Sequence, residues 1–195
     1  MTSSIPSIQL ASSTSKLPPM YDVAIHFTGE EICKKFISHL DSVLSAAGFT
    51  TFLHHDNAIE PMQSQEPVLD LCRVAIVVFT KTYSQSSWCL HQLQQIIELH
   101  EIYSRHVLPV YYEIRPSDVR LQKGDFGKAF KVTAQQTFSA QQLEHGMSMW
   151  SHALTKAANF YGWDESNYRS DAELVEKIVK IVYIWTFWEK NAHCT

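Results

Sequence analysis

Apolar residues along the first part of the chain gather in short runs that are separated by polar segments. Four such runs occupy residues 21–27, 49–53, 74–79 and 107–112. They are rich in Val, Ile and aromatic residues and are flanked by Gly, Pro or polar residues, which is typical of buried β-strands. We therefore predict a strand at each of these positions.

Between and after these runs, apolar residues recur at spacings of three and four, which predicts helices with one apolar face. The first helix contains Phe36 and Leu40 and stops at Gly48, because glycine readily ends a helix. Further helices are predicted over residues 88–103, 126–134 and 150–161, with a short helical piece at 68–72 and a turn at 116–120. A last helix begins at Ser170 and Asp171, which are common N-terminal caps.

Strands that alternate with helices predict an α/β fold with a parallel sheet of about five strands and helices on both faces. In such a sheet, ligands bind in the crevice beyond the carboxyl ends of the strands. The segments expected at that edge are residues 28–31, 54–66, 80–88 and 113–118. A ligand site, where there is one, is therefore predicted among these segments.

Composition fits one folded domain rather than a disordered chain. The chain has 195 residues, of which 45% are apolar and 18% charged. Residues 1–20 are rich in Ser, Thr and Pro and are predicted to be a disordered tail. The domain is expected over residues 21–165, and a C-terminal helix and tail over 166–195. The net charge of −4 gives no reason to expect nucleic-acid binding.

Composition also gives no sign of a metal centre. The four cysteines stand singly, without the spacing of structural zinc sites, as expected in a reducing compartment. Residues 54–56 read His-His-Asp, but adjacent strand residues point to opposite faces, and no third ligand is evident. We expect no metal and no resident cofactor.

The chain shows no signal peptide, and its longest apolar run, residues 178–188, is about half of the roughly 20 residues that a membrane helix needs. The sequence thus predicts a cytoplasmic or nuclear protein without a transmembrane segment. Residues 183–188 are apolar on several faces. They either pack back on the domain or contact another protein or a membrane surface.

One helix opens with Trp88, Cys89, Leu90, His91, Gln92 and Leu93. This block is similar to the Trp-Cys-Leu-x-Glu-Leu segment of plant TIR (Toll/interleukin-1 receptor/resistance protein) domains. Those domains occur at the N-terminus of disease-resistance receptors and in TIR-only proteins. Residues 21–30, 36–40, 107–130 and 150–163 resemble further motifs of the family in the same order, so the resemblance covers about 21–163 and implies its flavodoxin-like fold.

The resemblance implies an NAD-cleaving activity, and it also raises the main doubt about that activity. In the family the glutamate of the segment cleaves NAD, and its place is held here by the uncharged Gln92. Other departures lie at the same edge: Thr28 replaces an arginine, and His55 with Asp56 replaces a pair of aspartates. The loop 59–66 lacks glycine, and the helix after it is about one turn short.

Cleavage of the nicotinamide–ribose bond builds positive charge on the ribose, which a carboxylate stabilises or attacks. Glutamine has nearly the same shape but supplies no charge. Glu98 and Glu101 lie nearly two helical turns or more beyond Gln92, too far to replace it. We therefore expect little or no NAD hydrolysis.

A residual nucleotide site remains an open expectation, with NAD as substrate or bound ligand. By resemblance it would be formed by the following residues: Phe27, Thr28, Gly29, Asp56, Ser87 and Trp88. Trp88 offers a ring for stacking. The alternative is that Phe27 and Trp88 are ordinary core aromatics.

The resemblance also implies self-association. In the family the pair that matches Ser38 and His39 packs against its own copy, and the helices near Gly127 and Trp150 contribute too. The alternative for the first pair is an ordinary helix surface. Expected partners are other TIR domains, including those of full-length resistance receptors.

Two functions follow: a non-catalytic signalling adaptor of plant innate immunity, or an active NAD glycohydrolase. No phosphate-binding Walker A loop is present in the sequence, which predicts a TIR-only protein or a receptor product cut after its first exon.

Overall fold

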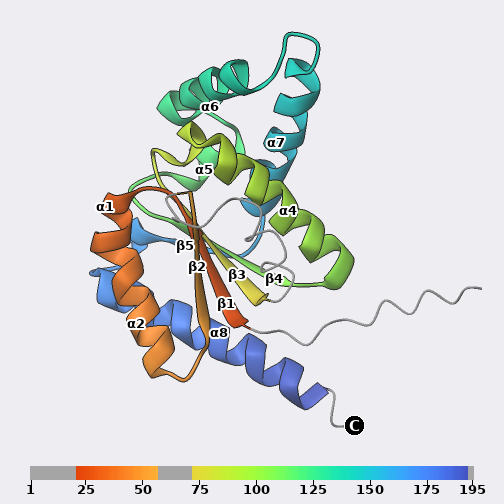
Figure 1. Ribbon diagram of the computed structural model, residues 1–195. Coiled ribbons are helices and arrows are strands. Elements are labelled where there is room, and N and C mark those ends of the chain that lie inside the picture. Colours follow the sequence, from red (N-terminus) through yellow and green to blue (C-terminus); the bar gives the residue numbers. More distant parts are fainter. Residues whose placement is uncertain (1–20, 57–71, 193–195) are drawn as a thin grey trace, which may run out of the picture.

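The computed structural model describes residues 21–56 and 72–192, with side chains described up to residue 187. Within them the chain forms a five-stranded parallel sheet in the order β2-β1-β3-β4-β5 (Figure 1). The strands are β1 Tyr21–Phe27, β2 Thr51–His55, β3 Cys72–Phe79, β4 His106–Tyr111 and β5 Trp163–Asp164. This arrangement confirms the predicted parallel sheet.

Several strand boundaries differ from the prediction, those of β4 by one residue at each end. β2 begins two residues later than expected because the chain first closes the preceding helix, where the Phe49 backbone N–H donates to the Leu44 carbonyl. β3 begins at Cys72, which had been placed at the end of a helical piece; the rest of that piece lies outside the described residues. β5 has only two residues, too few to leave an apolar run in the sequence.

Helices cover both faces of the sheet, as predicted (Figure 1). One face, called the α4 face, carries α4 Ser87–Tyr103, α5 Pro116–Arg120, α6 Gly124–Thr137 and α7 Leu143–Ala157. The other, called the α1 face, carries α1 Glu30–Ile32, the π-helix η1 Cys33–Ile37, α2 Ser38–Ala46 and α8 Asp171–Ala192. Two short 3₁₀ helices, η2 Tyr83–Gln85 and η3 Glu165–Asn167, complete the described elements.

The predicted helices are present, with shifts at their ends. Residues 116–120 form the helix α5 rather than a turn, because Pro116 occupies a first-turn position where its missing N–H costs nothing. α7 ends at Ala157, before Tyr161. Ser170 caps α8 as predicted, since its hydroxyl accepts the Glu173 backbone N–H at 3.3 Å.

Strand alternation divides the interior into two apolar clusters. On the α4 face, Leu90, Leu93 and Trp150 pack against alternate residues of the central strands. On the α1 face, Phe36 and Ile178 pack against the residues in between. Because neighbouring strand residues belong to different clusters, one step along a strand moves a side chain from one face to the other.

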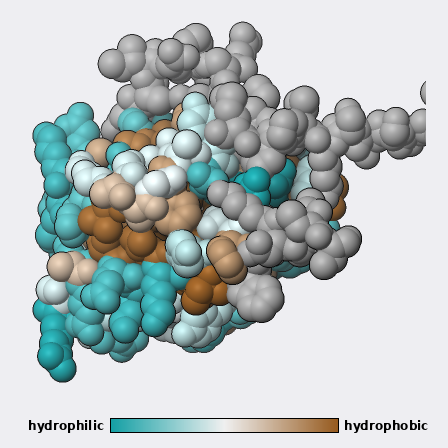
Figure 2. Space-filling view, turned by 90° about the horizontal axis from the view of Figure 1, so that it is seen from below, coloured by the Kyte–Doolittle hydropathy of each residue, from teal (hydrophilic) through white to brown (hydrophobic). Residues whose placement is uncertain are grey.

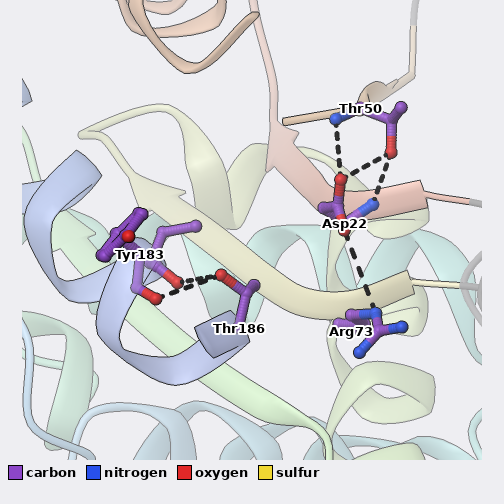
Figure 3. A network of polar contacts seen from close by, with 6 residues as sticks. Asp22, Thr50, Arg73, Tyr183 and Thr186 are labelled. Atoms are coloured by element: carbon purple, nitrogen blue, oxygen red, sulfur yellow. Dashed lines mark hydrogen bonds and ion pairs between the residues drawn. The ribbon is translucent and has the colours of Figure 1, made fainter. Parts of the chain in front are cut away.

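Polar contacts tie the strands together at the amino end of the sheet (Figure 3). The Thr50 backbone N–H and hydroxyl donate to Oδ2 of Asp22 at 2.9 and 3.0 Å. Arg73 Nε lies 3.9 Å from Oδ1 of the same carboxylate. Asp22 thus joins the start of β1 to the entries of β2 and β3, opposite the edge where ligands are expected.

The C-terminal helix packs back on the domain along one side. Val182 and Thr186 are buried, and the Trp185 ring stacks on His106 with centroids 4.6 Å apart. Tyr183 and Phe187 stack on each other and stay exposed. Figure 2 views the molecule from below, where apolar patches lie among polar residues. None of the described helices has the length and hydropathy to cross a bilayer.

Candidate functional site

Three segments that end or follow different strands meet at the carboxyl edge of the sheet. The hydroxyls of Thr28 and Ser86 both donate to Oδ2 of Asp56, at 2.7 and 2.8 Å. Thr28 follows β1, Asp56 follows β2, and Ser86 precedes α4. We call these three residues the Asp56 clasp.

The clasp also fixes the start of α4. Ser86 is its N-cap, and the Ser86 hydroxyl accepts the Cys89 backbone N–H at 3.2 Å. The Asp56 carboxylate therefore lies beside the positive end of a 17-residue helix, a favourable place for an anion. Thr28 and Asp56, two residues predicted to bind nucleotide, are thus brought together.

Trp88 and Gln92 lie one turn apart on the same side of α4. The half-buried Trp88 ring packs on His54 and His26, with centroids 4.7 and 5.7 Å apart. Gln92 is 6% exposed, and its Oε1 has no hydrogen-bond partner among the described residues. The Gln92 side chain is therefore buried and uncharged.

A buried chain of hydrogen bonds lies beneath Trp88. The Tyr83 hydroxyl donates to the Cys89 carbonyl at 3.3 Å, so it accepts from Nε2–H of His26 at 2.9 Å. In a neutral His26, Nδ1 is then an acceptor, and Nδ1–H of His54 donates to it at 3.0 Å. His54 Nε2 is left unprotonated, without a partner in the described part of the chain.

Burial keeps these groups neutral. It lowers the pKa of His26 to about 4 and that of His54 to about 2, because an imidazolium would lose its hydration there. Burial also raises the pKa of Tyr83 well above its usual value and that of Cys89 to about 12. The buried side chains beneath Trp88 are therefore polar but carry no charge at neutral pH.

The other residues predicted to bind nucleotide do not join this group. The Phe27 side chain belongs to the α1-face cluster and stacks on His55 with centroids 4.9 Å apart. Gly29 has a φ of 98°, a conformation that favours glycine, and it caps α1. The Ser87 carbonyl accepts from Nδ1 of His91 at 2.8 Å.

No carboxylate further along α4 stands in for Gln92. Glu98 is exposed and accepts from Nε2 of Gln94 at 3.0 Å, while Glu101 forms an ion pair with Lys156. Both acids are engaged on other parts of the surface. The carboxylate at the start of α4 is therefore that of Asp56. It accepts from the N-cap Ser86, more than one helical turn before Gln92.

The residues predicted to mediate self-association fall into two kinds. Ser38 and His39 are exposed on α2. Trp150 is 1% exposed and packs on Phe138 at 4.6 Å, and a Cβ at Gly127 would meet a backbone oxygen at 1.9 Å. Gly127 and Trp150 therefore shape α6 and α7 from within, and only the surfaces of these helices are free for a partner.

Two cavities open at the same edge. One of about 630 Å³ lies between the loops after β4 and β5 and includes Asp118 and Asp164. The other, of about 170 Å³, includes Thr28 and Gly29. Among the described residues, no group of three His, Cys, Asp or Glu side chains is placed to hold a metal.

Sequence reasoning missed His26 and Tyr83. The available signal was the alternation of β1, which puts His26 on the same face as Ala24 and hence beneath α4. That His26 also meets His54 depends on the β1–β2 register, in which these two residues pair.

Comparison with known proteins gives a consistent picture. The family model described as "TIR domain" matches residues 20–195. The chain is 36% identical to the Arabidopsis thaliana disease resistance protein RPP5 over 87% of this chain and 12% of that protein. It is also 36% identical to the TMV resistance protein N of Nicotiana glutinosa, over 87% of this chain and 15% of that protein. The chain therefore spans less than a fifth of these relatives.

Solved structures share the fold. The TIR domains of the activated Roq1 resistosome, which directly recognises the pathogen effector XopQ, superpose with a TM-score of 0.71. They are 33% identical over 82% of this chain and 98% of that chain. A heterodimer of the RPS4 and RRS1 TIR domains superposes with a TM-score of 0.53 at 19% identity, over 85% and 98% of the two chains, which shows the fold alone.

Proposed function

The chain belongs to the TIR domain family, and we propose that it acts in plant innate immune signalling by associating with other TIR domains, with little or no NAD hydrolysis of its own. The first part of this proposal rests on the relatives, which are disease-resistance proteins of plants. The second part rests on one observation, the buried, neutral Gln92 at the position of the family's glutamate.

Association is supported by the Roq1 relative, whose TIR domains are part of an assembled resistosome. In the present chain Ser38 and His39 are exposed on α2, and α2 packs beside α8. A helix face that is exposed and supported from below suits a contact with a second TIR domain. The partner would be a copy of this chain or the TIR domain of a full-length receptor, met in the cytoplasm or nucleus.

Weak or absent hydrolysis follows from electrostatics. A developing positive charge on the ribose needs a nearby anion to stabilise it. The electrostatic stabilisation is far stronger in a buried site than in water. The amide of Gln92 and the neutral imidazoles of His26 and His54 lie near Trp88 and supply no negative charge. The Asp56 carboxylate lies at the start of α4, bonded to Thr28 and Ser86. Removing one such stabiliser typically costs on the order of 10²–10³ in rate.

The half-exposed ring of Trp88 and the Asp56 clasp favour a retained nucleotide site. NAD would then be a ligand held by stacking and hydrogen bonds, without cleavage. The alternative function is an active NAD glycohydrolase. It would require a carboxylate at a position other than residue 92 to stabilise the positive charge on the ribose.

The activity test compares NAD turnover by wild type, Gln92→Glu and Gln92→Ala at high protein concentration. We expect wild type and Gln92→Ala to be silent and Gln92→Glu to gain at least about 10²-fold over background. If wild type cleaves NAD and Gln92→Ala does so equally well, the assignment of the catalytic position is wrong. If all three are silent, Thr28 or the loop 54–66 is also disabling, and the chain is a scaffold.

The association test uses the double variant Ser38→Ala/His39→Ala, with Glu98→Ala as the control because Glu98 is exposed on the opposite face of the sheet. Sedimentation with a second TIR domain should show at least about tenfold weaker association for the double variant only. Equal binding by all forms would contradict the role given to α2.

A further inference from the structure

The smaller cavity at the carboxyl edge lies beside the Asp56 clasp and shares Thr28 with it. It measures about 170 Å³ and is enclosed by α1, η1 and the loops after β1, β3 and β4. We call it the Lys35 cavity, after a lining that includes Glu31, Ile32, Lys35, Lys81, Tyr112 and Glu113. Ile32 and Tyr112 belong to the α1-face cluster, whereas Trp88 packs on the α4-face cluster. The sheet edge therefore lies between the cavity and Trp88.

Charges in the Lys35 cavity are balanced. Lys35 Nζ lies 2.7 Å from Oε1 of Glu113. This pairing raises the pKa of Lys35 and lowers that of Glu113, so both groups are charged at neutral pH. Lys81 and Glu31 add one charge of each sign, and neither forms an ion pair within the described part of the chain. The cavity thus offers two cations and two anions.

The floor of the cavity is partly apolar and firmly held. The Tyr112 hydroxyl donates to Oδ2 of Asp171 at 2.8 Å, which anchors the ring to the start of α8. Lys35 Nζ lies 5.5 Å from the centroid of this ring. Ile32, which is 7% exposed, completes the apolar part. A ligand can therefore place carbon on Tyr112 and Ile32 and charge against the rim.

Hydroxyl groups line the side toward β1 and β3. Thr80 and Thr82 lie on either side of Lys81, and their Oγ1 atoms are 3.2 Å apart. One of the two hydroxyls donates to the other, which leaves one O–H beside Lys81 that can donate to a carboxylate. Glu113 and Glu31, which also line the cavity, are acceptors that suit an ammonium group.

This charge pattern discriminates between classes of small molecule. A simple anion such as phosphate would meet two carboxylates, and a simple cation would meet two ammonium groups, so each would be repelled by half of the rim. A molecule that carries both charges on one carbon meets a partner for each. We propose that the Lys35 cavity binds a free α-amino acid as its zwitterion.

The carboxylate is held by Lys81 and by one of the two threonine hydroxyls, and the ammonium group by Glu113 and Glu31. The side chain rests on Tyr112. The proposal does not depend on NAD cleavage or on association with other TIR domains, because Lys81, Glu31 and Glu113 carry it and none of them belongs to the Asp56 clasp or to α4.

The test is a titration of the purified full chain, labelled with ¹⁵N, against each common L-amino acid and against inorganic phosphate, followed by NMR. We expect at least one amino acid to shift the amides of Gly29, Lys81 and Glu113 in a saturable way. Its N-acetyl and amide derivatives, each lacking one charge, should bind at least about tenfold more weakly. Phosphate should not saturate these shifts.

Two variants separate the cavity from general surface charge. Lys81→Met should weaken amino-acid binding at least about tenfold. Lys34→Met is the matched control, since Lys34 is an exposed neighbour of Lys35 that pairs with Glu30 at 3.7 Å and does not line the cavity. Glu31→Gln gives a second variant at the ammonium end. Saturation by phosphate instead, no response to any amino acid at millimolar concentration, or equal effects of Lys81→Met and Lys34→Met would each overturn the proposal.

Discussion

The two faces of the sheet present opposite kinds of polar chemistry at the same carboxyl edge. On the α4 face the polar side chains of His26, His54 and Gln92 are buried and neutral. On the α1 face Lys35 and Glu113 are open to solvent and fully charged. A single step along a strand separates the two settings, as His54 and His55 show by pointing to different faces.

The contrast shows what burial does to a site. On the α1 face water screens the charges, so each contributes little by itself. On the α4 face an anion would act strongly because little water competes with it, but the same burial makes an unpaired charge costly. In the proposed function, an amide at residue 92 avoids that cost and gives up the electrostatic stabilisation of a carboxylate.

The largest expected effect is a loss of stability in mild acid that comes from the α4 face alone. His26 and His54 have folded-state pKa values of about 4 and about 2, while an unfolded histidine has a pKa of about 6.5. Between pH 6.5 and 4.5 the unfolded chain therefore binds protons that the folded chain does not. The free energy of unfolding should fall as pH falls, by up to about 3 kcal/mol per pH unit for the pair and about 5 kcal/mol in all.

Urea denaturation at a series of pH values measures this slope. The matched control is His26→Leu/His54→Leu, which removes both titrating groups while filling much of the same space. Between pH 6.5 and 4.5 the free energy of unfolding of this double variant should depend less on pH, because only the remaining titratable groups contribute. An unchanged slope would mean that the pair does not titrate on unfolding.

A smaller effect is expected from breaking the buried chain at its centre. His26→Leu leaves the Nδ1–H of His54 without its acceptor and removes the donor to Tyr83. Each buried group left unpaired costs about 1–3 kcal/mol, so the variant should lose about 3 kcal/mol of unfolding free energy at pH 7. Chemical denaturation measures it, and His39→Ala on the exposed surface of α2 is the control, expected to change little.

His26→Leu/His54→Leu again sharpens the interpretation, because it removes both partners of the histidine contact. Replacing both members of a buried pair by apolar groups is often nearly neutral. The double variant should therefore recover part of the loss seen in His26→Leu. The loss of unfolding free energy in the double variant is compared with the summed losses of His26→Leu and His54→Leu. A larger loss in the double variant would show that packing, and not the hydrogen bond, holds the pair.

Most of the fold could be predicted from the chain because the relevant signals are local. Apolar runs located β1, β3 and β4, and helical spacing located α2, α4 and α6. β2 was misplaced because Phe49 is apolar yet belongs to the turn that closes α2. β5 was missed because its two residues, Trp163 and Asp164, are ordered by pairing with β4 and not by any pattern of their own.

The site was predictable only in part, because its contacts join distant segments. The resemblance located Gln92 and Trp88 on one helix, and their one-turn spacing puts them on the same side. It could not show that Phe27 faces the opposite cluster, or that His26 meets His54 across 28 positions of sequence. Those facts depend on strand register and face, which a single residue of shift would reverse.

The smallest effect is expected at the rim of the α4 face, where the Asp56 clasp is partly exposed. Asp56→Ala removes the acceptor shared by Thr28 and Ser86, but water can reach the two hydroxyls that remain. The loss of unfolding free energy should be about 1 kcal/mol, which is the usual net contribution of such hydrogen bonds to stability. Chemical denaturation of Asp56→Ala and Asp22→Ala compares their losses of unfolding free energy. Asp22 contacts Thr50 and Arg73 at the other end of the sheet and is more buried than Asp56. A larger loss for Asp56→Ala than for Asp22→Ala would show that the carboxyl edge, and not the amino edge, holds β1 and β2 together.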